Sequence, residues 1–268
     1  MKYSRIFQVL LRVLLALFLL PIAALVLFSF LPSQTAQGIF SGEGIASIRL
    51  TAEQFIKALG DSTYGRQFRN SAVLTLLSLL FAMPISLGAG LFLSRLPSRF
   101  QRPLLALYVF SLLAPFQIIM LPVYKLSLLF GLYDSIWSVI LLNAFSPIGP
   151  LTVCTLLRAI DESQWEAASL ETDSALKILR HILLPQIAPG LAALALLIFA
   201  QVWNMVEQPL ILLPDARLRP LSTSFNDIVK SSSDYAFAGA LLCALPVLAF
   251  YLIAAVPAAC GKRRRQNP

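Results

Sequence analysis

The chain has 268 residues, of which 58% are hydrophobic and only 13% charged, and its formal net charge is +8. Soluble domains average roughly 25% charged residues, so this composition excludes an ordinary soluble domain and indicates a membrane protein. A basic balance can also indicate nucleic-acid binding, but here the cations flank long apolar runs, which is typical of membrane topology. We therefore expect lipid, and no nucleic acid, around this chain.

The residue types that usually carry metal or redox chemistry are scarce. The three cysteines, Cys154, Cys243 and Cys260, lie in or at the end of apolar runs with no redox or metal-binding spacing, and His181 is the only histidine. We interpret the cysteines as small buried apolar residues and expect no metal site. The chain also lacks a GxxxxGK[ST] phosphate loop and any nucleophile motif. We therefore expect neither an enzyme nor a chain that binds ATP itself.

The first long apolar run covers residues 13–31 and follows a short basic segment that contains Lys2, Arg5 and Arg12. A cleaved signal peptide would have a shorter apolar region, of about 7–15 residues, and a small-x-small cleavage site. The length of this run therefore favours an uncleaved first span. Residues 33–69 are polar and rich in glycine, and we expect them to form an external loop.

Five further runs approach the roughly 20 residues that a helix needs to cross a bilayer. We predict these spans at residues 71–94, 104–124, 135–157, 190–213 and 237–259. Prolines inside them are tolerated where neighbouring helices or a water-lined cavity satisfy the freed backbone groups. We predict a single membrane domain over residues 1–268, in which the first span precedes a core of residues 71–260.

The distribution of charge predicts the orientation of these six spans. An even number of spans puts both termini on one side. The cations expected on that side are Lys2, Arg5, Arg12, Arg95, Arg99, Arg102, Arg158, Lys177, Arg180, Lys262, Arg263, Arg264 and Arg265. The charges on the other side cancel, so the whole net charge of +8 falls on the side of the termini. By the positive-inside rule, both termini are expected in the cytoplasm.

The longest polar interruption in the second half, residues 158–189, then also lies in the cytoplasm. Ser163 and Glu166 fit a capping box at the start of a short amphipathic helix. Ala167 and Ala168 favour helix and let another backbone approach closely. Pro185 and Pro189 are expected to bound this segment. Alternatively, Glu166 is only a helix cap and the alanine pair only helix filler.

The order Glu166-Ala167-Ala168, an acid at Glu171, and an apolar run that ends in Pro185 resemble the EAA loop of permease subunits in binding-protein-dependent ABC importers. The resemblance implies a coupling helix that docks on a separate ATP-hydrolysing subunit. The residues it assigns to coupling are Glu166, Ala167, Ala168, Ser169, Leu170, Glu171, Thr172 and Asp173. Thr172 and Asp173 depart from the usual Gly and Ala of the family.

Three flanking segments resemble the carbohydrate-type, maltose-transporter-like branch of this family. They are Arg69 to Ser71 with Arg95, the Pro-x-Tyr…Gly-Leu stretch of residues 120–141, and Trp203-Asn204. The resemblance implies an all-α, six-helix, type I importer permease in the bacterial inner membrane. It also implies a second permease subunit in a heterodimer, two cytoplasmic ATPases that bind ATP and Mg, and an extracytoplasmic solute-binding protein. An ion-coupled secondary transporter is the alternative, but we find no internal repeat and few charges inside the spans.

A sugar path is expected to be lined by amides and hydroxyls, which bond to ring hydroxyls, and by aromatic rings. The leading candidates are Gln117, Asn143, Asn204, Glu207 and Gln208, with Ser146, Tyr124 and Trp203 as further candidates. Glu207 stands out because an ionisable residue inside a membrane is costly and usually functional. The alternatives are hydrogen bonding between helices for the amides, and an interfacial or packing position for Glu207. The sequence does not name the solute.

Overall fold

The protein is described here by a computed structural model. The residues that the structure describes are 2–41, 49–161, 163–164, 170, 174–224 and 234–265. Within them the chain forms helices and connections and no β-strand, which confirms the predicted all-α class. The chain divides into two compact units, Met1–Phe68 with Ser224–Pro246, and Arg69–Thr223 with Val247–Pro268. A single membrane domain over residues 1–268 stays a prediction.

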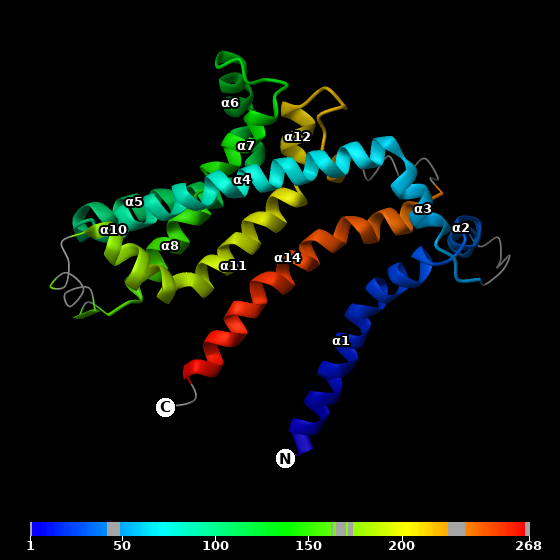
Figure 1. Ribbon diagram of the computed structural model, residues 1–268, viewed down its shortest axis with the longest axis horizontal. Coiled ribbons are helices and arrows are strands. Elements are labelled where there is room, and N and C mark those ends of the chain that lie inside the picture. Colours follow the sequence, from blue (N-terminus) through cyan, green and yellow to red (C-terminus); the bar gives the residue numbers. More distant parts are fainter. Residues whose placement is uncertain are drawn as a thin grey trace. The chain divides into compact units, whose positions relative to one another are not determined.

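Five helical segments are long and apolar enough to cross a membrane. They are Phe7–Ser29 within α1 (Lys2–Ser29), Ser62–Arg95 (α4), Ile136–Arg158, Leu179–Trp203, and Ala236–Ala254 within α14 (Ala236–Arg265). A sixth candidate is the pair α5 (Ser98–Leu113) and α6 (Phe116–Leu129). The described residues therefore hold up to six spans, in the predicted order (Figure 1).

The predicted third span, residues 104–124, is not one straight helix. α5 and α6 meet at an angle of 97° (Figure 1). Pro115 lies at the break and has no N–H to continue the helix. A residue before proline is disfavoured in the α region, and Ala114 is extended with ψ of 122°. Pro115, which we expected to lie within one continuous helix, therefore divides this span into two helices.

In the first unit, one buried glutamine holds the end of α1. The Nε2 of Gln54, on α3 (Glu53–Gly60), donates to the carbonyl oxygens of Phe28 at 2.9 Å and Leu31 at 2.7 Å. The last carbonyls of a helix have no partner within it, and Gln54 is only 1% exposed. Its amide therefore gives the Leu31 carbonyl a partner and the Phe28 carbonyl a second one, beside the N–H of Leu31 at 3.2 Å. α2 (Ser33–Ser41) lies between α1 and α3 in the chain.

Asp61 caps α4 in the same unit. Its Oδ1 accepts from the backbone N–H of Thr63 at 2.7 Å and of Tyr64 at 3.4 Å, and its Oδ2 accepts from the hydroxyl of Tyr235. The Tyr64 hydroxyl donates to the carbonyl of Gly239 at 2.9 Å. These bonds tie the start of α4 to the start of α14.

In the second unit, α4 packs closely against α8 (Ile148–Arg158). A Cβ on Gly149 would lie 1.8 Å from the Oγ of Ser86, and one on Gly90 would lie 2.5 Å from the Cβ of Val153. Small residues permit such approaches between membrane helices. One buried cluster of this unit consists of Ala82, Val153, Leu157, Leu183, Ile187, Leu194, Ile198 and Val202, and a second of Leu74, Val139, Ile140, Leu212 and Leu213.

The expected boundary at Pro185 and Pro189 is wrong. Helix begins earlier, with α10 (Ala175–Ile178) and a π-helical turn η1 (Leu179–Leu183), and continues as α11 (Leu184–Trp203). Pro185 lies in the first turn of α11, and the N–H of Leu184 bonds to the carbonyl of Leu179, five residues back. The wider π turn accommodates a proline that would interrupt a regular helix.

The fifth span also ends before residue 213, where the sequence placed its end. α11 stops at Trp203, residues 204–206 are not helical, and α12 (Glu207–Leu212) is a separate short helix. Pro209 cannot donate to the carbonyl of Met205, four residues earlier. That carbonyl instead accepts from the hydroxyl of Ser222 at 2.6 Å. The break places Glu207 and Gln208 in the first turn of a new helix.

Candidate functional site

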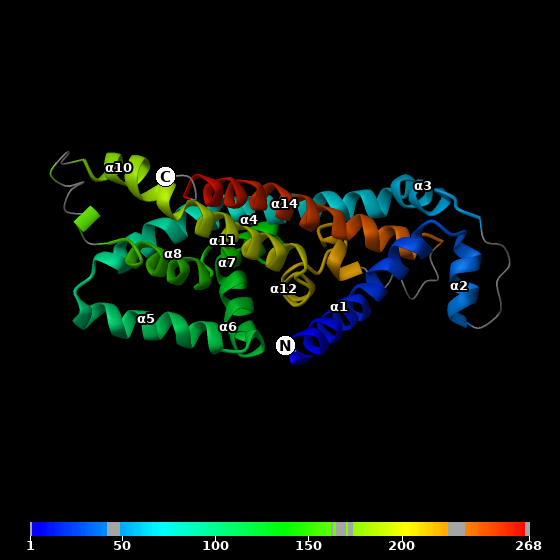
Figure 2. The ribbon, with the colours of Figure 1, turned by 90° about the horizontal axis from the view of Figure 1, so that it is seen from below.

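The candidate path residues gather where α12 meets α6 and α7 (Ile136–Ala144) (Figures 1 and 2). Each of these helices begins after an interruption of the chain's helical structure. Pro115 precedes α6, and the non-helical residues 204–206 precede α12. Ser135 caps α7, because its Oγ accepts from the N–H of Trp137 at 3.4 Å. Four predicted residues form what we call the amide–carboxylate cluster: Gln117, Asn143, Glu207 and Gln208.

Gln117 and Glu207 form the first pair of the cluster. The Nε2 of Gln117 donates to both carboxylate oxygens of Glu207, at 3.1 Å each, and both side chains are exposed. A carboxylate has about four acceptor positions. A single NH₂ group therefore leaves most of the capacity of Glu207 for another donor.

Asn143 and Gln208 form the second pair. The Nδ2 of Asn143 donates to the Oε1 of Gln208 at 2.8 Å and to the carbonyl of Val139 at 2.9 Å, and lies 3.7 Å from the sulfur of Met205. Asn143 is 4% exposed, whereas Gln208 is half-buried. The buried amide therefore positions Gln208, whose own Nε2 donates no hydrogen bond within the described residues.

The other candidates do not join the cluster. The Nδ2 of Asn204 donates back to the carbonyl of Ala200 at 2.9 Å, at the end of α11. Trp203 is 3% exposed and stacks on Phe199, with ring centroids 5.8 Å apart. Its ring therefore packs in the protein interior in this conformation and offers no face to a sugar. Tyr124 packs edge-on against Tyr133 at 5.2 Å, and the N–H of Ser146 bonds to the carbonyl of Asn143 at 3.2 Å.

The chemistry of the cluster is hydrogen bonding. Amide N–H groups donate, and amide and carboxylate oxygens accept, which suits a ligand with many hydroxyls. No lysine, arginine or histidine among the described residues forms an ion pair with Glu207. Nor does the described part of the chain contain a group of three or more His, Cys, Asp or Glu that could hold a metal.

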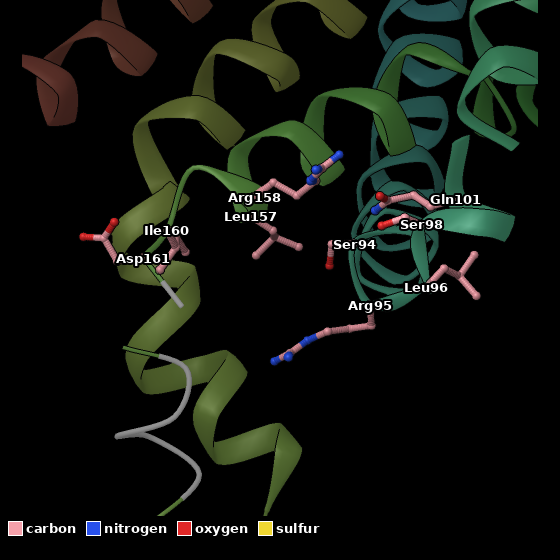
Figure 3. A pocket seen from close by; sticks show the side chains of 9 residues that line it. All are labelled: Ser94, Arg95, Leu96, Ser98, Gln101, Leu157, Arg158, Ile160 and Asp161. Atoms are coloured by element: carbon pink, nitrogen blue, oxygen red, sulfur yellow. The ribbon is translucent and has the colours of Figure 1, made fainter. Parts of the chain in front are cut away.

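A cavity of about 560 Å³ (Figure 3) lies among the ends of α4, α5 and α8 that point away from α12 (Figure 1). It is lined by the end of α4, the start of α5 and the end of α8: Ser94, Arg95, Leu96, Ser98, Gln101, Leu157, Arg158, Ile160 and Asp161. Two arginines and one acid make this lining basic. Asp161 is the last described residue before the predicted capping box, and it precedes the predicted coupling segment by five positions in the chain.

Most of the predicted coupling residues lie outside the described residues. These are Glu166, Ala167, Ala168, Ser169, Glu171, Thr172 and Asp173. Leu170 is described and is 88% exposed. The partner of Ser163 in the predicted capping box, Glu166, is among the undescribed residues, so that cap stays a prediction.

Comparison with known families decides the class of the chain. Residues 82–258 match the family described as binding-protein-dependent transport system inner membrane component. The chain belongs to this family. An inner-membrane location and the predicted resemblance to permease subunits of binding-protein-dependent ABC importers are thereby confirmed.

Relatives of this permease carry names from the carbohydrate-type branch. It is 22% identical over 209 residues to the diacetylchitobiose uptake system permease protein DasC of Streptomyces coelicolor, covering 76% of this chain and 75% of the relative. It is 24% identical over 244 residues to the arabinooligosaccharides transport system permease protein AraQ of Bacillus subtilis, covering 88% and 85%. These relatives confirm the predicted branch.

The fold of the permease matches a solved structure of a bacterial ABC transporter involved in the import of the acidic polysaccharide alginate. The TM-score is 0.75 at 20% sequence identity, and the match covers 94% of this chain and 96% of that chain. At this identity the likeness shows the fold alone, and it confirms the predicted importer-permease architecture.

Sequence reasoning did not single out Met205 and Ser222, which support the permease's cluster. Met205 contacts Asn143, and Ser222 holds the carbonyl of Met205. Pro209 could have indicated that this carbonyl needs another donor, because proline has no N–H. Nothing in the local sequence identifies Ser222 as that donor.

Proposed function

We propose that this permease is one half of the membrane domain of an ATP-driven importer for a saccharide or a related small polar solute. The observation that carries the proposal is the family match over residues 82–258. The names of the two relatives, which refer to diacetylchitobiose and arabinooligosaccharides, support the sugar class. The hydrogen-bonding chemistry of the amide–carboxylate cluster supports the same class.

The solute path of this proposal passes the cluster on α6, α7 and α12. Discontinuous helices near a path expose backbone groups and free helix ends to the solute. Here α6 and α12 both begin at a break, and neither has a side-chain cap. Gln117 and Glu207 stand in the first turns of these two helices and are exposed. A hydroxyl-rich solute could therefore exchange its bonds with water for bonds with these groups.

Energy in this proposal comes from a separate ATPase, because the sequence has no phosphate loop. The segment Glu166 to Asp173 is the proposed lever, which docks in the cytoplasm and transmits closure of the ATPases to the spans. Two ATPase copies would bind ATP and Mg. The lining of the basic cavity ends at Asp161, five residues before that segment in the chain. Both termini are proposed to lie on the same, cytoplasmic side.

The proposed assembly contains a second, different permease and an extracytoplasmic solute-binding protein. The family description, a binding-protein-dependent transport system, supports the binding protein. Exposed apolar side chains cover much of α1 and α5, for example Leu17 at 67% and Phe110 at 71%. Such surfaces require lipid or other membrane helices around them.

The test begins with the complete complex, co-purified with the products of neighbouring genes, and a ligand screen on its binding protein. Uptake of the solute and solute-stimulated ATP hydrolysis are then measured in proteoliposomes. Ala167→Arg is expected to abolish both activities while the complex still assembles, because a long cation prevents close docking. Ala216→Arg, the same change in an exposed loop beyond α12, is the matched control.

Two results would overturn the proposal. One is full transport and full stimulated ATP hydrolysis with Ala167→Arg. The other is uptake by this chain alone, driven by an ion gradient without any ATPase, which would favour a secondary transporter.

A further inference from the structure

Glu207 carries a charge that nothing in the described structure neutralises. Both ion pairs in the described residues involve Lys57, in the other unit. Glu207 has only the neutral amide of Gln117, at 3.1 Å from each oxygen. A charge at a membrane path is costly when it has no partner. The exposed carboxylate of Glu207 is therefore free to bind a hydrogen-bond donor or a cationic group of the solute.

No charged side chain on the helices packed around Glu207 neutralises its carboxylate. α7 has no charged residue, and α12 has none besides Glu207 itself. On α6 the charged residue is Lys125, eight residues after Gln117, which is about 12 Å further along the helix at 1.5 Å per residue.

In the loop after α12, Arg219 and Asp215 are engaged elsewhere, and Arg217 forms no ion pair with Glu207 in the described residues. The guanidinium of Arg219 donates to the carbonyls of Leu213 and Pro214, at 3.0 Å each. The Oδ1 of Asp215 accepts from the backbone N–H of Arg217 at 2.8 Å, and the Oδ1 of Asp134 accepts from the N–H of Asp215 at 3.1 Å. The cluster therefore presents a net negative charge together with one unused amide donor, on Gln208.

A saccharide with free hydroxyls complements this arrangement. Its hydroxyls donate to the unused lone pairs of Glu207, and its oxygens accept from the Nε2 of Gln208. A protonated amine would add an ion pair with Glu207. A uronate would bring a second carboxylate to the same place, where the surrounding protein screens the repulsion less than water does.

We propose that Glu207 selects the solute by charge, so that the path admits uncharged and amine-bearing saccharides and disfavours saccharides that carry carboxylates. The inference rests on the proposed saccharide path and specifies its substrate class. The feature that carries it is an exposed carboxylate that is held by one amide and forms no ion pair with any cation among the described residues.

The test measures binding of three trisaccharides of matched length to the purified permease–ATPase complex without the binding protein: a neutral one, a glucosamine one and a galacturonate one. Equilibrium dialysis is suitable because it needs no turnover. We expect the galacturonate to bind at least about tenfold more weakly than the neutral ligand, the size of effect that like charges near contact produce. Glu207→Gln is expected to narrow this difference, and Gln117→Glu to widen it.

Glu53→Gln is the matched control, because it removes an exposed carboxylate from the other unit, and it should leave all three affinities unchanged. Equal affinity for the galacturonate and the neutral ligand would overturn the inference, as would an unchanged ratio in both cluster variants. If no trisaccharide binds while ATP-driven uptake persists, the charge selection is wrong and the proposed function stands. If uptake needs no ATPase, the proposed function itself fails.

Discussion

The Nε2 of Gln117 donates to both carboxylate oxygens of Glu207, a residue 90 positions further along the chain. Each partner stands in the first turn of a helix that begins at a break, α6 after Pro115 and α12 after residues 204–206. The two interruptions of the apolar pattern therefore meet in space. Breaks in membrane helices are tolerated where they line a cavity or are buried in protein, which fits a polar site at this place.

Gln208→Leu is expected to destabilise the second unit. The change removes the acceptor of the 2.8 Å bond from Asn143, and Asn143 is only 4% exposed, so one of its N–H groups loses its partner in the interior. Leaving a buried donor unsatisfied costs about 1–3 kcal/mol. The measurement is thermal unfolding of the purified protein in detergent, together with uptake by the assembled complex.

Gln201→Leu is the matched control for that change. Gln201 is exposed on α11, and its side-chain amide makes no hydrogen bond in the described residues. If both variants lower the unfolding midpoint equally, the Asn143–Gln208 bond does not support the cluster.

Gly149→Ala is expected to force α4 and α8 apart. The new Cβ would lie 1.8 Å from the Oγ and 2.6 Å from the Cβ of Ser86. Overpacking of this kind costs about 1–3 kcal/mol. Ser86→Gly removes both of those atoms and leaves the Ser86 Cα at 3.7 Å, an ordinary contact. The double variant should therefore recover most of the lost thermal stability.

Gly88→Ala provides the control for the same substitution in α4, because its Cβ would meet nothing within 4 Å. A Gly149→Ala protein as stable as the wild type would show that the two helices are further apart than described. Failure of Ser86→Gly to rescue it would show that the clash lies elsewhere.

Tyr235→Phe is expected to destabilise the first unit in a pH-dependent way. The Tyr235 hydroxyl and, more weakly, the N–H groups of Thr63 and Tyr64 lower the pKa of Asp61, against the opposing effect of burial. A carboxyl whose pKa is lowered by folding stabilises the protein above its unfolded pKa, near 3.9, and this contribution disappears as the pH falls below that value. Loss of the hydrogen bond should cost about 1 kcal/mol at pH 7.

Unfolding midpoints of wild type and Tyr235→Phe therefore differ most at neutral pH and converge as the pH falls from about 4 through the lowered pKa of folded Asp61. Burial and the bond to Asp61 raise the pKa of Tyr235 to about 12, so the tyrosine stays neutral throughout this range. Tyr251→Phe, on an exposed residue of α14, should change nothing at either pH. A gap that widens on acidification would contradict the capping position of Asp61.

Local sequence predicted the class and order of the spans because apolar length and charge are properties of single segments. It also singled out the four residues of the amide–carboxylate cluster as polar groups in apolar surroundings. It could not predict that Gln117 meets Glu207 or that Asn143 meets Gln208, because those pairings depend on where Pro115 and Pro209 redirect the chain. The π turn before Pro185 was missed for a related reason. In a sequence, a proline indicates the end of a helix, although a π-helical i to i+5 hydrogen bond allows the helix to continue past it.

Cysteine labelling should place the start of α5 in the cytoplasm and the loop after α12 outside. Ser98→Cys and Ala216→Cys each put a thiol at an exposed position, in a background where Cys154, Cys243 and Cys260 are replaced by alanine. Arg95, Arg99 and Arg102 surround the first position, and cytoplasmic loops carry an excess of such cations. A membrane-impermeant maleimide should label Ala216→Cys in intact cells, and Ser98→Cys only after permeabilisation. The reverse pattern would put residues 158–189 outside the cell, where they could not meet a cytoplasmic ATPase.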